Sequence, residues 1–74
     1  MNRASALPSK SDRLQVLSAR EREIAHLVLR GLSNKAIAHQ LGLSIGTVKA
    51  HVHRILQKLG AKDRYNLIVD SASR

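Results

Sequence analysis

Apolar residues recur along the chain at spacings of three and four, the pattern of helices that bury one side. The clearest stretch lies at 45–59, and two shorter stretches lie at 19–30 and 34–41, each followed by a glycine. Since glycine after an apolar stretch is a common helix stop, the sequence predicts three helices with these bounds. The predicted inward residues are Ile24, Leu27, Val28, Ile37, Ala38, Leu41, Val48, Val52, Ile55, Leu56 and Leu59.

Short polar residues precede each predicted helix, where a side-chain oxygen can cap the first turn. Ser18, Ser33 and Ser44 hold these positions, and Glu21 completes an S-x-x-E capping box with Ser18. Asp63 can cap a fourth helix. That helix is expected to carry on one side Tyr65, Ile68, Val69 and Ala72.

The helical pattern occupies one continuous region, which we expect to be a single all-α domain over residues 14–74. It would consist of a tri-helical core and a C-terminal helix, because no segment alternates in the manner of a strand. Residues 1–13 show no apolar period, so we expect a flexible lead-in or linker, with a basic arm that touches DNA as the alternative. The absence of cysteine rules out disulfides and suits the cytoplasm.

A joint of about three residues connects the predicted helices 34–41 and 45–59, and so short a joint makes the helices cross steeply. Ala38 would present only a methyl group at the crossing. Gly42 can adopt the positive φ of a tight turn, and Val48 would close a small core beneath it. This Ala, Gly and Val spacing is typical of a DNA-binding helix-turn-helix, whereas the alternative is an ordinary helical hairpin.

Charge favours the DNA-binding alternative. Thirteen Lys and Arg against five Asp and Glu give the chain a formal charge of +8, which points to a polyanionic partner. The side of helix 45–59 opposite its apolar stripe has no carboxylate, while helix 19–30 mixes both signs. Tyr65 is the only aromatic residue, which disfavours RNA and single strands read by stacking. No apolar run suits a membrane span, so double-stranded DNA is the expected partner.

The outer face of helix 45–59 supplies the candidate contacts to DNA. Gly46 and Ala50 are small, so this helix can lie close to the base pairs. The residues expected to contact bases are Lys49, Ala50, His53 and Gln57. Those expected to contact phosphates are Ser33, Asn34, Lys35, Thr47, Arg54 and Lys58.

Enzymatic chemistry and metal binding are not expected. The four histidines are scattered: His51 and His53 point to different sides of one helix, and His26 and His39 lie in other helices. We therefore expect no metal and no cofactor, with His51 at the edge of the core. Glu21 and Glu23 are better explained by capping and surface pairing than by acid–base work. The chain has no Gly-rich phosphate loop and no nucleophile elbow.

Four segments together resemble the LuxR-type domain: LSARERE at 17–23, GLSNKAIA at 31–38, TVKAH at 47–51 and KLG at 58–60. That domain is the output module of NarL- and FixJ-like response regulators and of quorum-sensing regulators, and it also exists free-standing, as in GerE. The resemblance covers about 14–72. It implies a bacterial transcription regulator that works in the cytoplasm at the nucleoid and binds DNA as a dimer. It leaves open whether the regulator is free-standing or larger.

The resemblance also implies roles for residues. It makes the third helix the recognition helix, with Lys49, Ala50 and His53 facing bases and phosphate contacts near Asn34, Lys35 and Thr47. It implies dimerisation through the fourth helix, on a face that would include Ile68, Val69 and Ala72.

Two departures from the family pattern stand out. Ala36 occupies a position where many members have Glu, so the second helix lacks a capping box. Tyr65, Asn66 and Asp70 make the fourth helix less standard. Two alternatives stay open: a sigma-factor promoter-recognition region, which would engage RNA polymerase, and an interaction module that forms mixed dimers without binding DNA.

Overall fold

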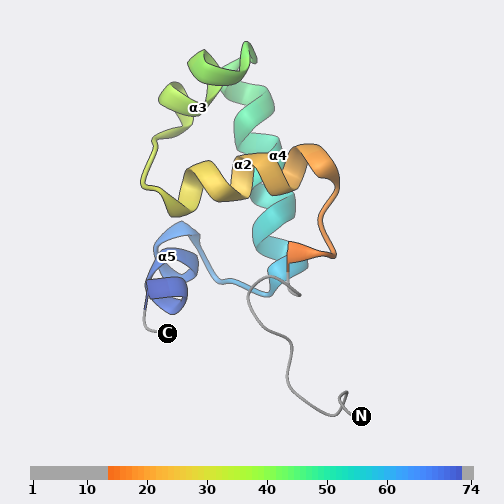
Figure 1. Ribbon diagram of the computed structural model, residues 1–74, viewed down its shortest axis with the longest axis vertical. Helices are drawn as coiled ribbons and strands as arrows, with labels where there is room; N and C mark the ends of the chain where they lie inside the picture. Colours follow the sequence, from red (N-terminus) through yellow and green to blue (C-terminus); the bar gives the residue numbers. More distant parts are fainter. Residues whose placement is uncertain (1–13, 73–74) are drawn as a thin grey trace.

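The computed structural model describes residues 14–72, with side chains up to Asp70 (Figure 1). Its elements are helices α2 (Ala19–Leu29), α3 (Asn34–Leu41), α4 (Ile45–Leu59) and α5 (Arg64–Ala72). The described residues contain no strand, so the all-α prediction is confirmed. The lead-in predicted at 1–13 lies outside the described residues.

The helix starts follow the predicted caps. The Ser18 hydroxyl accepts a hydrogen bond from the Glu21 amide at 3.1 Å, and the Glu21 carboxylate accepts one from the Ser18 amide at 2.9 Å. The Ser33 hydroxyl accepts a hydrogen bond from the Ala36 amide at 3.1 Å, but the methyl side chain of Ala36 has no oxygen to accept from the Ser33 amide and complete a second capping box. Asp63 accepts from the Asn66 amide at 2.7 Å and so caps α5.

Helix α2 ends at Leu29, one residue earlier than the sequence predicted. Arg30 is the C-cap, and Gly31 takes the positive φ of 92° that reverses the chain. The Leu32 amide then donates to the Leu27 carbonyl at 3.1 Å, which satisfies a terminal acceptor of the helix.

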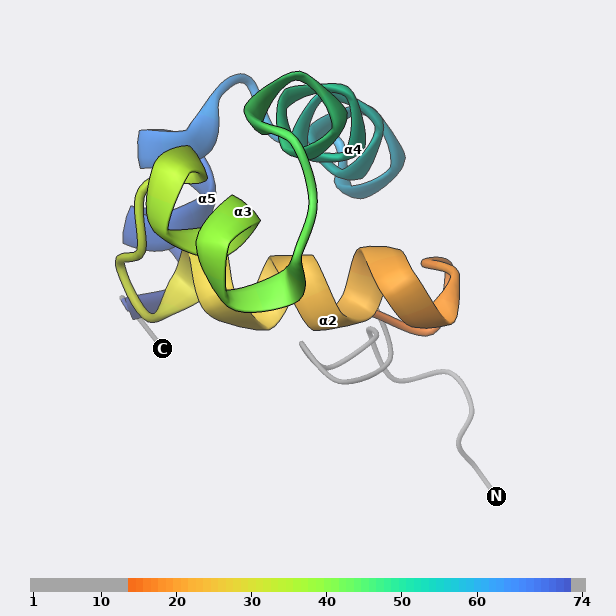
Figure 2. The same cartoon turned by 90° about the horizontal axis from the view of Figure 1, so that it is seen from above.

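The core lies between α2, α3 and α4. Figure 2 views α4 nearly end-on while α2 runs across the view, so these two helices cross steeply. The fully buried side chains come from all three helices and include Ile24, Val28, Ile37, Val48 and Ile55.

Helix α5 packs against α2 and α4. Its buried anchor is Leu67, 6% exposed, which the sequence analysis did not single out. Tyr65, by contrast, is 76% exposed, and Ile68 is half-buried. The core-facing side of α5 therefore centres on Leu67 rather than on the residues expected to share one face with Tyr65.

Candidate nucleic-acid interface

Helices α3 and α4 form a helix-turn-helix. Gly42 has a φ of 68°, and the Leu43 amide donates to the Ala38 carbonyl at 2.9 Å, so the chain reverses within residues 42–44. Ala38 and Val48 are both buried at the junction of the two helices. The small residue, the left-handed glycine and the buried valine therefore have the places that their spacing predicted.

The two sides of α4 differ sharply. Its inner side is buried through Val48, Val52 and Ile55. All four residues expected to contact bases are exposed on the outer side: Lys49, Ala50, His53 and Gln57. The packing of residues 14–72 therefore leaves this face uncovered.

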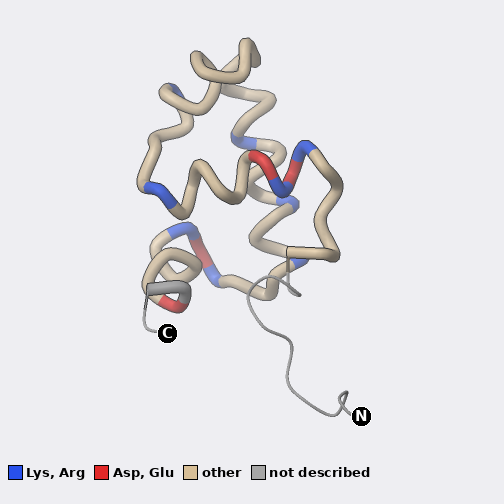
Figure 3. The backbone as a smooth tube through the Cα atoms, in the orientation of Figure 1, with Lys and Arg blue, Asp and Glu red and all other residues tan. Residues whose placement is uncertain are grey.

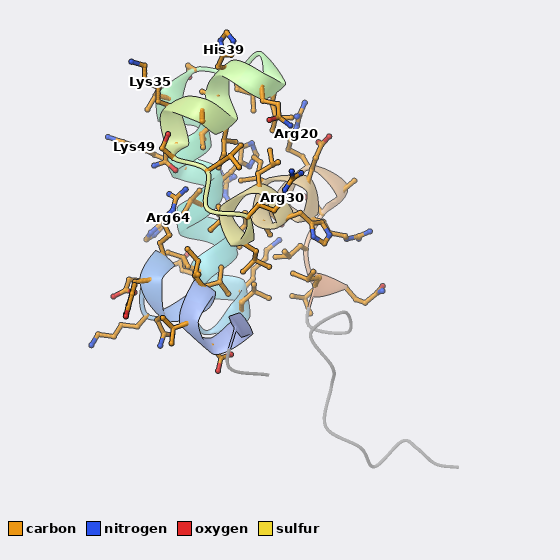
Figure 4. All side chains as sticks on the ribbon, turned by 60° about the vertical axis from the view of Figure 1, so that its left-hand side comes forward. Arg20, Arg30, Lys35, His39, Lys49 and Arg64 are labelled. Atoms are coloured by element: carbon orange, nitrogen blue, oxygen red, sulfur yellow. The ribbon has the colours of Figure 1, made fainter. Side chains whose placement is uncertain are left out.

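Basic residues recur along α4, whereas the acidic residues of the described chain lie on α2 and at α5 (Figure 3). In Figure 4 the side chains of Lys35, from α3, and Lys49, from α4, point out on the same side of the molecule. Both helices of the helix-turn-helix thus place a cation on this side of the molecule.

The start of α4 has a distinctive local structure. Ser44 caps it by accepting from the Thr47 amide at 3.0 Å, and its hydroxyl donates to the exposed Thr47 hydroxyl at 2.8 Å. A methyl group on Gly46 would meet only the Ser44 hydroxyl, 4.0 Å away. Glycine weakens a helix relative to alanine, and no close contact with the described residues requires it at this position.

Lys58 is engaged within the domain. Its ammonium lies 2.8 Å from the Glu21 carboxylate, whose side chain is 6% exposed. The hydrogen bond from Lys58, followed by the bond from the Ser18 amide, lowers the pKa of Glu21 from 4.5 to about 2. This ion pair joins the start of α2 to the end of α4 and gives Lys58 a partner other than phosphate. Arg54, on the same flank of α4, is exposed.

Asn34 is also engaged. The Arg64 guanidinium, at the start of α5, donates to the Asn34 side-chain oxygen and to the Leu32 carbonyl. It therefore ties α5 to the turn before α3. Sequence reasoning missed this contact, because the partners lie 30 and 32 residues apart and no local pattern marks them. Ser33 and Lys35, on either side of Asn34, are exposed.

The histidines do not gather into a site. Among the described residues, no three His, Cys, Asp or Glu side chains lie close enough to hold a metal ion. His51 is half-buried, as expected for a residue at the core edge, and its Nδ1 atom is buried. No described helix is long and apolar enough to cross a membrane.

The Glu21 and Glu23 carboxylates have structural partners, as predicted. Glu21 takes part in the capping box and the ion pair with Lys58, and Glu23 pairs with Arg20 one turn away at 3.2 Å.

These features define a helix-turn-helix domain with an open, cationic recognition face. Residues 15–70 match the family of bacterial regulatory proteins described as the luxR family. The chain therefore belongs to the LuxR family, as its motifs indicated, and is a DNA-binding domain of the type found in these transcription regulators. The family is one of regulators and not a class of enzymes.

Individual relatives are regulators as well. The chain is 45% identical over 58 residues to the oxygen regulatory protein NreC of Staphylococcus aureus (strain bovine RF122 / ET3-1), covering 78% of this chain and 27% of that protein. It is 42% identical over 62 residues to the monoamine regulon transcriptional regulator of Klebsiella aerogenes, covering 84% and 27%. The chain thus spans roughly a quarter of the length of the curated relatives it matches.

Proposed function

We propose that this domain binds specific sequences of double-stranded DNA by placing the outer face of α4 in the major groove, and that it thereby controls transcription. The observation that carries the proposal is the exposure of a carboxylate-free face on α4, directly opposite its buried stripe. An α-helix fits the major groove, where each base pair has a distinct pattern of donors and acceptors.

The proposed base contacts come from four exposed residues of α4. Lys49 can donate to guanine O6 or N7, and His53 and Gln57 can hydrogen-bond base edges. Ala50 projects only a methyl group, which allows close approach and can touch a thymine methyl. These contacts would determine sequence preference.

Phosphate contacts are proposed on both sides of the turn. Ser33, Asn34 and Lys35 lie at the start of α3, and Thr47 and Arg54 lie on α4. Because backbone contacts set position rather than sequence, changes at these residues should weaken binding to all duplexes alike. Lys58 is proposed as a further phosphate contact on α4, weakened by its ion pair with Glu21, because 42% of its side chain stays exposed.

We also propose that two copies pair through α5. Val69 is 43% exposed on this helix, and Ile68 beside it is half-buried; Ala72 lies in the last turn. A dimer would read half-sites about one helical turn apart, ~10 bp. The Val69→Asp variant should bind DNA as a monomer, so its complex with DNA should have a smaller sedimentation coefficient than the wild-type complex. If this variant still occupies both half-sites, α5 is excluded as the interface. RNA polymerase is a further proposed partner, at the nucleoid in the cytoplasm.

The direct experiment is a binding isotherm on labelled 20-bp duplex and on its single strand, repeated over a salt series. The affinity for duplex should fall as the salt concentration rises, because binding of the protein's Lys and Arg side chains releases counterions from the phosphates. The Arg54→Ala variant should flatten this dependence, whereas Lys58→Ala should chiefly lower the unfolding temperature. Absence of duplex binding would favour the interaction module. Absence of duplex binding together with tight RNA polymerase binding would favour a sigma-type region.

A further inference from the structure

The first residue of the proposed recognition helix is an exposed isoleucine. Ile45 is 43% exposed and is the first residue of α4, next to its cap, Ser44. The inner side of the helix is already filled by the buried residues Val48 and Val52. Ile45 lies three residues before Val48, at the N-terminal edge of this stripe, so burial accounts for part of its apolar side chain, while 43% of it is left uncovered by the described residues.

The position of Ile45 suits contact with bases. It precedes Lys49 by four residues, so the two side chains lie on neighbouring parts of the helix surface, about 6 Å apart along the axis. Side chains in a helix lean toward its N-terminus, so the Ile45 side chain leans toward the N-terminal end of α4. The next residue, Gly46, leaves space beside it. The first residues of a recognition helix are those that reach base edges.

Only one base offers an apolar group in the major groove, and that group is the C5-methyl of thymine. Isoleucine has no donor or acceptor, so the remaining groups on base edges cannot hydrogen-bond to it. Along B-DNA, ~6 Å corresponds to about two base-pair steps. We infer that Ile45 is a specificity-determining residue that packs against a thymine methyl within about two base pairs of the base bound by Lys49. This inference rests on the proposed function.

The test uses single-methyl changes in DNA. A duplex is selected from a random pool by the full chain, and each thymine is replaced in turn by deoxyuridine, which removes only the methyl. At one thymine per half-site, affinity should fall about fourfold, the effect of one methyl leaving an apolar contact. Ile45→Ala should bind the thymine duplex about as weakly as wild type binds the uracil duplex, and should no longer distinguish the two.

Two control variants separate other sources of the effect. Val16→Ala shortens another exposed apolar side chain, outside the helices, and should keep the full uracil effect. Ala50→Gly removes the methyl of the base contact proposed to touch thymine, and should also keep the uracil effect at the thymine assigned to Ile45. Circular dichroism checks folding, and Ile45→Val provides a milder change with a reduced uracil effect.

Two results would overturn the inference while leaving the proposed function intact: duplex binding that tolerates uracil at every thymine, or an undiminished uracil effect in both Ile45 variants. Failure of the wild-type chain to retain any duplex would overturn the proposed function itself, and the inference with it.

Discussion

Replacing Gly46 by alanine should strengthen the fold and weaken DNA binding. Gly46 lies in the first turn of α4 without a positive φ, and an added methyl would lie 4.0 Å from the Ser44 hydroxyl. Alanine therefore fits the folded domain without strain. Because alanine is a better helix former, the substitution should stabilise the domain by about 0.5–1 kcal/mol. In a domain of this size that raises the unfolding temperature by roughly 2–8 °C.

On DNA the same methyl would lie between α4 and the groove. Overpacking a close contact typically costs about 1–3 kcal/mol, so affinity for the selected duplex should fall by about fivefold or more. Thermal unfolding followed by circular dichroism and fluorescence anisotropy on the duplex measure the two effects separately. Gly60→Ala is the contrasting control: its φ is 68°, so that variant should lose stability.

One outcome would refute this reasoning. If Gly46→Ala is more stable and still binds the duplex with wild-type affinity, then no partner approaches this part of α4 closely. The first turn of the helix would then lie outside the groove, and the glycine would have no explanation in DNA binding.

Four further changes test other parts of the account. Lys49→Ala should weaken the selected duplex by ~1–3 kcal/mol and relax its sequence preference in a competition assay; equal losses on random duplex would make Lys49 a phosphate contact. Lys35→Ala should weaken all duplexes alike and flatten the salt dependence, and an altered base preference would contradict that role. Arg64→Ala should lower both stability and DNA affinity, because it releases α5 and the Asn34 side chain together; unchanged amide exchange around the turn would argue against this. The pKa of Glu21 is lowered to about 2, so its contribution to the free energy of unfolding is present above about pH 4.5 and is lost as the pH falls toward 2. The difference in the free energy of unfolding between wild type and Glu21→Gln should therefore shrink over that range.

The local features of the fold were predictable from sequence because they depend on near neighbours. The bounds of α3 and α4 follow from a serine cap at one end and a glycine at the other, each within a turn of the helix. The capping box at Ser18 is similarly local, and the outward position of Lys49 follows from the helical period. The end of α2 was placed one residue late because the apolar pattern does not separate its last residue from the C-cap, Arg30.

Tertiary contacts were not predictable in this way. The Lys58–Glu21 pair joins residues 37 apart, and the Arg64–Asn34 pair joins residues 30 apart. Both depend on how whole helices dock, which the period of one helix does not specify. Leu67 was missed for the same reason: α5 has several apolar residues, and only its packing on the other helices selects the buried one.

Methylation interference tests the central claim most directly. Dimethyl sulfate methylates guanine at N7 in the major groove and adenine at N3 in the minor groove. If the outer face of α4 reads the major groove, N7-methylated guanines within each half-site should be depleted from the bound duplex, and N3-methylated adenines should be retained. Depletion confined to N3-methylated adenines, or no depletion at either base, would contradict major-groove recognition by α4.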